Sequence, residues 1–167
     1  MASYNDAHVA ATEILENVWG SRGFPVDSAW IARSLGLDVL RVDLDDNVSG
    51  ALIKQKGKDP VIFINARDNK QRQRFSCAHE LGHYVQRTSA KCEGGDTYEY
   101  VDLRSDLAKS GTDQDEIFAN RFAACLLMPE DEVRRLATYN ATPVVMAFHF
   151  NVSAEAMRHR LNHLKLR

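Results

Sequence analysis

The motif H-E-x-x-H, which His79, Glu80 and His83 form, requires a helix with room for an ion beside it. In a helix the two histidines lie one turn apart on the same face, about 6 Å along the axis. Two imidazoles at that separation can bind one Zn²⁺ at about 2.0–2.1 Å each. Glu80 lies beside them and can act as a base toward water. The motif therefore predicts two metal ligands and a base, and a third ligand has to come from elsewhere in the chain.

The residues around the motif predict one helix over about 68–87. An apolar stripe at helical spacing faces one side, made by Phe75, Ala78, Leu81, Gly82 and Val85. Glycine costs about 1 kcal/mol relative to alanine inside a helix, so Gly82 indicates close packing or room for the metal site. The alternative is a surface helix with two solvated histidines.

A second helix is predicted over about 113–127, ended by Met128-Pro129. Glu116 is the candidate third ligand, because it lies 33 residues after His83 (116 − 83) and can return on a separate helix. Asn120, one turn later, could form a hydrogen bond with one of the histidines and orient it. Asp113 and Asp115 compete for the ligand role, although Asp113 looks like the helix cap. Glu116 could instead be a solvated carboxylate that the helix dipole favours.

The remaining chain predicts an α+β fold in a single domain, 1–167. N-terminal helices are expected over about 5–36, with Asp27 as a cap, and C-terminal helices over about 129–166, with Thr142 and Ser153 as caps. Three short strands within about 37–65 suggest a small antiparallel three-stranded sheet, a meander. Its most apolar strand, 61–64, could dock an extended peptide along its edge or only pack against the metal helix. A strand at 98–103 is expected within an otherwise long loop.

Composition excludes several function classes. The net charge is −2, so nothing in the overall charge favours binding to nucleic acid. No apolar run is long enough for a membrane span, and the first residues lack the basic start of a signal peptide. Three cysteines without paired short spacing argue against a disulfide framework and fit the cytoplasm. Cys77 is expected to be a buried apolar group and not a ligand.

Two blocks carry a resemblance to a known family. Residues 72–85, R-x-R-F-S-C-A-H-E-L-G-H-Y-V, and residues 116–129, E-I-F-A-N-R-F-A-A-C-L-L-M-P, resemble the signature blocks of the ImmA/IrrE metallopeptidases of bacteria and phages. A weaker likeness extends over most of the chain and includes Ser49-Gly50 and Ile64-Asn65. The resemblance implies a zincin-like fold of the gluzincin type with one catalytic zinc ion. Zinc would be bound by His79, His83 and Glu116, with Glu80 as the catalytic base.

One position departs from the family pattern. An acidic residue often stands two positions before the asparagine of the second block, and this chain has Phe118 there. Glu116 is thus the clearer ligand candidate. Peptide hydrolysis also needs a donor to the developing oxyanion, and Tyr98, Tyr100 and His149 are candidates.

The resemblance also implies a substrate. Members of the family cleave or otherwise inactivate helix-turn-helix repressors, which releases phage, mobile-element or stress genes. We therefore expect a repressor protein as the partner, cleaved in trans, and no direct binding to nucleic acid or membranes. One alternative is a non-proteolytic partner-binding protein, as in a toxin–antitoxin pair. Another is a DNA-binding regulator that uses the helix-turn-helix-like rhythm of residues 143–164.

Overall fold

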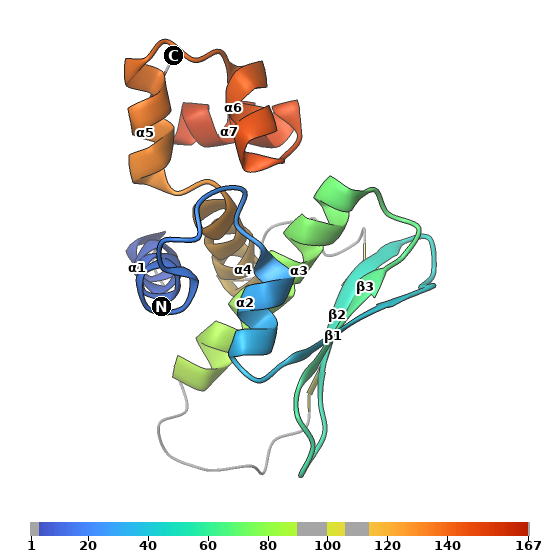
Figure 1. The fold of residues 1–167 in the computed structure, drawn as a ribbon. Helices are drawn as coiled ribbons and strands as arrows, with labels where there is room; N and C mark the ends of the chain where they lie inside the picture. Colours follow the sequence, from blue (N-terminus) through green and yellow to red (C-terminus); the bar gives the residue numbers. More distant parts are fainter. Residues whose placement is uncertain (1–3, 90–99, 106–113, 167) are drawn as a thin grey trace.

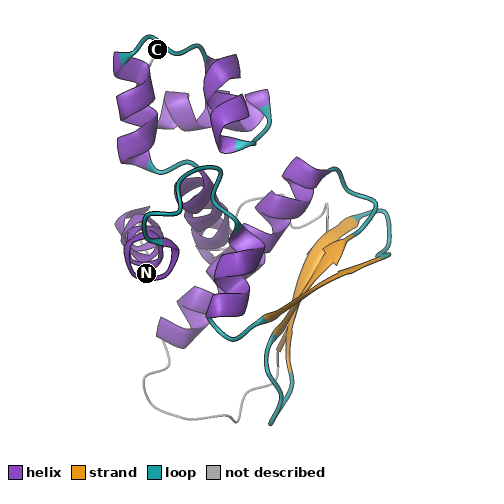
Figure 2. Ribbon diagram, in the orientation of Figure 1, coloured by secondary structure: helices purple, strands orange, loops and turns teal. Residues whose placement is uncertain are grey.

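The computed structural model describes residues 4–89, 100–105 and 114–166, which form helices on one side of a small sheet (Figures 1 and 2). This confirms the α+β class. The helices are α1 Tyr4–Ile14, a π-helical turn η1 Leu15–Trp19, α2 Ser28–Ser34, α3 Lys70–Ser89, α4 Gln114–Leu127, α5 Glu130–Thr138, α6 Pro143–Phe150 and α7 Ala154–His163. The strands are β1 Asp38–Val42, β2 Val48–Lys54, β3 Val61–Asn65 and β4 Tyr100–Ser105.

Local capping explains where several helices begin, as the sequence predicted. The carboxylate of Asp27 accepts hydrogen bonds from the backbone N–H groups of Ala29 and Trp30, both at 3.0 Å. The hydroxyl of Thr142 caps α6, and that of Ser153 caps α7 through the N–H of Ala156 at 3.0 Å. Each cap satisfies a donor that the first turn of a helix leaves without an intrahelical partner.

The sheet differs from the predicted meander. Its strand order is β1-β3-β2-β4, with β1 parallel to β3 and β2 antiparallel to both β3 and β4. The prediction of a three-stranded antiparallel meander was therefore wrong in its strand order, because β3 lies between β1 and β2 and pairs with β1 in parallel. The fourth strand, β4, corresponds to the strand predicted at 98–103 and joins the sheet beside β2. The turns reverse the chain twice, which sets the strand directions but not the neighbours.

Burial explains why β3 takes the central place. Ile62 and Ile64 are almost completely buried, and the last residue of the strand, Asn65, is 2% exposed. The Asn65 amide donates to the carbonyl oxygens of Val48 at 2.8 Å and Asp45 at 3.3 Å, which ties down the connection from β1 to β2. Because both edges of β3 are paired, no peptide can add to it, and this strand only packs against α3.

The metal-motif helix α3 packs closely against α4. A Cβ atom on Gly82 would lie 3.0 Å from the Cα of Ala119 and 3.1 Å from Cδ1 of Phe122, closer than ordinary contact. The glycine therefore allows the two helix backbones to approach each other. This confirms the prediction of close packing at Gly82. This approach brings the start of α4 beside the middle of α3.

The C-terminal helices are joined to the rest through backbone carbonyls. The Arg74 guanidinium donates to the carbonyls of Val26 at 2.6 Å, Phe150 at 3.0 Å and Asn151. Buried Arg160 donates to the carbonyl of Met128 at 3.0 Å. The buried apolar residues from Ala7 to Leu164 form one core cluster. Within the described ranges, no helix combines the length and apolar character that a membrane span requires.

Candidate metal centre

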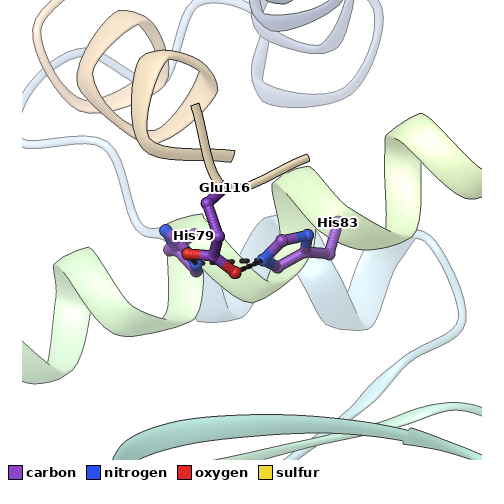
Figure 3. Close-up of side chains that lie close together, drawn as sticks. All are labelled: His79, His83 and Glu116. Atoms are coloured by element: carbon purple, nitrogen blue, oxygen red, sulfur yellow. Dashed lines mark hydrogen bonds and ion pairs between the residues drawn. The ribbon is translucent and has the colours of Figure 1, made fainter. Parts of the chain in front are cut away.

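Three side chains from two helices converge at the contact between α3 and α4 (Figure 3). His83 Nε2 lies 3.0 Å from His79 Nε2 and 3.1 Å from Glu116 Oε1. His79 Nε2 lies 3.3 Å from Glu116 Oε2. The structure thus brings together the three residues that the sequence nominated as ligands.

These separations fit a single ion. Ligand atoms about 2.0–2.1 Å from a tetrahedral ion lie about 3.3 Å from one another. The two Nε2 atoms are 3.0 Å apart, and each lies 3.1–3.3 Å from one oxygen of the Glu116 carboxylate, Oε1 for His83 and Oε2 for His79. Both histidines are buried, whereas the Glu116 side chain is 20% exposed. Two imidazoles and one carboxylate are a donor set that zinc sites use, and they leave a coordination position open for water or substrate.

Asn120 orients one of the imidazoles. Its Oδ1 lies 3.0 Å from His79 Nδ1. When Nδ1–H donates to this amide oxygen, the lone pair of the ring stays on Nε2, which faces His83 and Glu116. The position predicted for Asn120, one turn after Glu116, therefore places it behind the ligand.

The histidines also determine the charge of Glu116. When their Nε2 atoms carry protons, His79 and His83 donate hydrogen bonds that hold the pKa of the Glu116 carboxyl well below its usual range, against the opposing effect of partial burial. A bound ion would take the place of these protons. The carboxylate is therefore charged at neutral pH. An anionic ligand is the form that a divalent cation binds.

The comparison with protein families agrees with this geometry. The sequence profile of the IrrE N-terminal-like domain, a peptidase family, matches residues 32–162. This chain belongs to that family. The matched span starts within α2, ends within α7 and includes both signature blocks, so the predicted ImmA/IrrE relationship is confirmed. A search of the curated proteins finds no match.

In this IrrE-type domain the side chain of Glu80 extends from α3 toward β2. Its side chain is completely buried, and a Cβ atom on Gly50 of β2 would lie 3.2 Å from Glu80 Oε1. Gly50 therefore leaves room for the carboxylate. The residues alone did not single out Gly50, since a glycine within a strand has several explanations. Its appearance in the family-like pair Ser49-Gly50 was the available signal.

The competing acidic residues and the oxyanion candidates lie elsewhere or outside the described residues. Asp115 is exposed and accepts a hydrogen bond from Gln86 Nε2 at 2.9 Å. Asp113 and Tyr98 lie outside the described residues, and Tyr100 is described only as the first residue of β4, opposite Lys54. His149 Nε2 lies 2.9 Å from Glu132 Oε1, and the imidazole packs against Phe24 and Phe150. The structure does not bring His149 to the group of three ligands.

Two further positions of the metal helices have structural roles. Phe118, which replaces the acidic residue common in the family, is buried and stacks on Phe122, with ring centroids 6.3 Å apart. Cys77 is also buried, as predicted, and burial raises the pKa of its thiol to about 12. A protonated, enclosed thiol is a poor metal ligand and a poor nucleophile.

Proposed function

We propose that this protein is a zinc-dependent endopeptidase that cleaves a helix-turn-helix transcriptional repressor in trans. The observation that supports hydrolysis is the convergence of His79, His83 and Glu116 within 4.8 Å, next to the buried Glu80. Membership of a peptidase family gives the reaction class. The repressor as substrate rests on the resemblance of the two signature blocks to ImmA/IrrE proteins.

Each residue has a role in this mechanism. His79, His83 and Glu116 would hold the ion, and Asn120 would keep the His79 ring in the tautomer that binds it. When bound, zinc polarises the scissile carbonyl and lowers the pKa of water in its open position to about 7. Zinc is the metal we propose, because two histidines and a carboxylate are a common catalytic donor set for it.

Glu80 moves the proton. Its carboxylate takes a proton from the attacking water while the water oxygen bonds to the carbonyl carbon. When the carbon–nitrogen bond breaks, Glu80 returns this proton to the leaving amine. Burial beneath β2 keeps the carboxylate in one place, which is what a general base requires. We place the reaction in the cytoplasm, where the buried thiols of Cys77 and Cys125 stay reduced.

The test is the variant Glu80→Gln, assayed with helix-turn-helix repressors of the same genome, beginning with any that is encoded beside this protein. We expect zinc to bind with unchanged affinity and cleavage to fall by about 10²–10⁴-fold, the usual contribution of a general base. His79→Ala should lose both zinc and cleavage. Wild-type cleavage by Glu80→Gln would refute the proposed chemistry.

A second outcome would favour the other reading. If the wild-type protein binds the repressor tightly and no fragment ever appears in the presence of zinc, the protein acts as a non-proteolytic partner. Salt-dependent binding of the protein itself to DNA would instead favour a DNA-binding regulator that uses α6 and α7.

A further inference from the structure

A cleft of about 620 Å³ lies between the first turns of α3, the second half of α4 and most of the length of α7. Its lining residues do not include the three candidate metal ligands, but two of them are neighbours of His79. Asn120, which orients His79, lines it, and so does Phe75, whose ring centroid lies 6.5 Å from that of His79. A molecule bound in the cleft would therefore lie next to the turn of α3 that carries His79.

The cleft is also linked to β2. Arg72 lines it, and Arg72 Nε donates to the hydroxyl of Ser49 at 3.1 Å. Ser49 precedes Gly50, the residue that packs on the Glu80 carboxylate. Through Asn120 and Arg72, the cleft is thus linked by hydrogen bonds to His79 and to the strand that covers the base.

The walls of the cleft are basic. The guanidinium groups of Arg72, Arg121 and Arg160 line it together with two histidines, whereas Glu155 is the only carboxylate among its lining residues. The chain as a whole has a net charge of −2, so this local excess of positive charge is not a reflection of composition. Burial, and after it the positive charges of Arg160 and Arg121, lower the pKa of His163, while the negative charge of Glu130 has the smaller, opposite effect.

The base of the cleft is apolar, and the guanidinium groups of Arg72 and Arg160 are held in place by hydrogen bonds. Arg160 is 3% exposed and donates to the carbonyl of Met128, so the charge at the back of the cleft has a defined position. Apolar surface comes from Phe75, Ala124, Met128, Val152 and Ala156. A volume in the range of about 300–1,000 Å³ suits a group of a few side chains.

We propose that this cleft binds an acidic segment of the polypeptide on which the metal group acts. Carboxylates are the groups that arginine side chains recognise through paired hydrogen bonds, and the apolar base suits leucine-like residues beside them. That this polypeptide is a substrate rests on the proposed peptidase function, whereas binding of the acidic segment does not. Within the repressor, the segment would flank the scissile bond.

The experiment measures binding without turnover. The probe is a fluorescein-labelled peptide with the core Glu-Leu-Leu-Glu, compared with the same peptide carrying glutamine in place of glutamate. Fluorescence anisotropy is recorded on the zinc-loaded Glu80→Gln protein at low salt, where exposed charges are least screened. We expect the acidic peptide to bind about tenfold or more tightly than its glutamine counterpart.

A matched pair of substitutions locates the binding. Arg121 and Arg158 are both exposed arginines, and only Arg121 is among the residues that line the cleft. Introduced into the same background, Arg121→Gln should weaken the acidic peptide by about tenfold, whereas Arg158→Gln should leave it within about twofold. His159→Gln, at a second exposed lining position, should also weaken it, which guards against a local effect of one substitution.

Three results would overturn the proposal. They are equal affinity for the two peptides, equal loss from Arg121→Gln and Arg158→Gln, and no measurable binding of either peptide. If duplex DNA of arbitrary sequence displaces the peptide and loses its own affinity in Arg121→Gln, the cleft binds phosphate groups of nucleic acid, and the proposal also fails. Failure of Glu80→Gln to reduce cleavage would refute the peptidase mechanism but leave Arg121-dependent binding unaffected, so the two failures can be distinguished.

Discussion

Gly82→Ala should raise the helix propensity of α3 and at the same time disturb its packing against α4. Alanine is favoured over glycine within a helix by about 1 kcal/mol, so an isolated α3 would become more stable. In the folded protein, however, the new methyl group would lie 3.0 Å from Ala119 Cα and 3.3 Å from the Ala119 carbonyl oxygen. Carbon atoms pack at about 3.5–4.0 Å. The two helices would therefore have to separate by about 0.5–1.0 Å.

The magnitude of this shift decides the outcome. Overpacking of this kind costs about 1–3 kcal/mol, which exceeds the gain in helix propensity. The net loss is about 0–2 kcal/mol, or up to roughly 8 °C in melting temperature for a chain of this size. Metal-ligand distances tolerate only about 0.2 Å. Because Glu116 lies one turn before Ala119 on α4, the shift should weaken zinc binding by about tenfold or more.

The assay is thermal denaturation of the metal-free protein together with zinc titration against a chromophoric chelator. Ser89→Ala is the matched control, because it improves helix propensity at the exposed end of the same helix. We expect wild-type zinc affinity from this control. If Gly82→Ala melts higher than the wild type and binds zinc equally well, the argument from close helix approach is wrong.

Three other predictions concern the same region. Asn120→Ala should lower zinc affinity or kcat/KM by about 10–100-fold, because the His79 ring loses its orienting acceptor. Asn120→Asp keeps an acceptor oxygen and should lose less. Equal losses in the two variants would argue against this role of Asn120. Zinc at about a hundredfold excess over its Kd should stabilise the fold by about 2.7 kcal/mol, or roughly 5–11 °C, in differential scanning fluorimetry, and His83→Ala should show no such shift. In a Cys92→Ser variant the remaining thiols, Cys77 and Cys125, are buried. An aromatic disulfide reagent should therefore label neither thiol in the native protein and both in denaturant. Rapid labelling of Cys77 in the native protein would contradict the burial that raises the pKa of its thiol.

The metal helix could be predicted because its information is local. Residues 79–83 contain two ligands and the base at a spacing that one helical turn brings together. The caps Asp27, Thr142 and Ser153 also act over a few residues, and each caps its helix as predicted. Glu116 could be named from the sequence as a candidate beside Asp115. Only the packing of α4 shows that Glu116 lies against the histidines and Asp115 beside Gln86.

The strand order could not be predicted in the same way. Turn residues reverse the chain wherever they occur, so the alternating directions of β1, β2 and β3 follow from the sequence. The choice between a meander and the observed order depends on which strand is most completely covered on both faces, and on the amide of Asn65, which bonds to carbonyls 17 and 20 residues earlier.

The sequence by itself thus determined which groups the candidate site contains: two imidazoles and a carboxylate on one helix, and a second carboxylate available from another. Only the tertiary structure decided how the second carboxylate reaches the histidines, that Gly50 leaves room for Glu80, and that arginines from α3, α4 and α7 share one cleft. The physical reason is the distance along the chain over which each interaction acts. Helical spacing and capping act over about four residues, whereas helix separation and shared clefts depend on packing between segments that lie far apart in the chain.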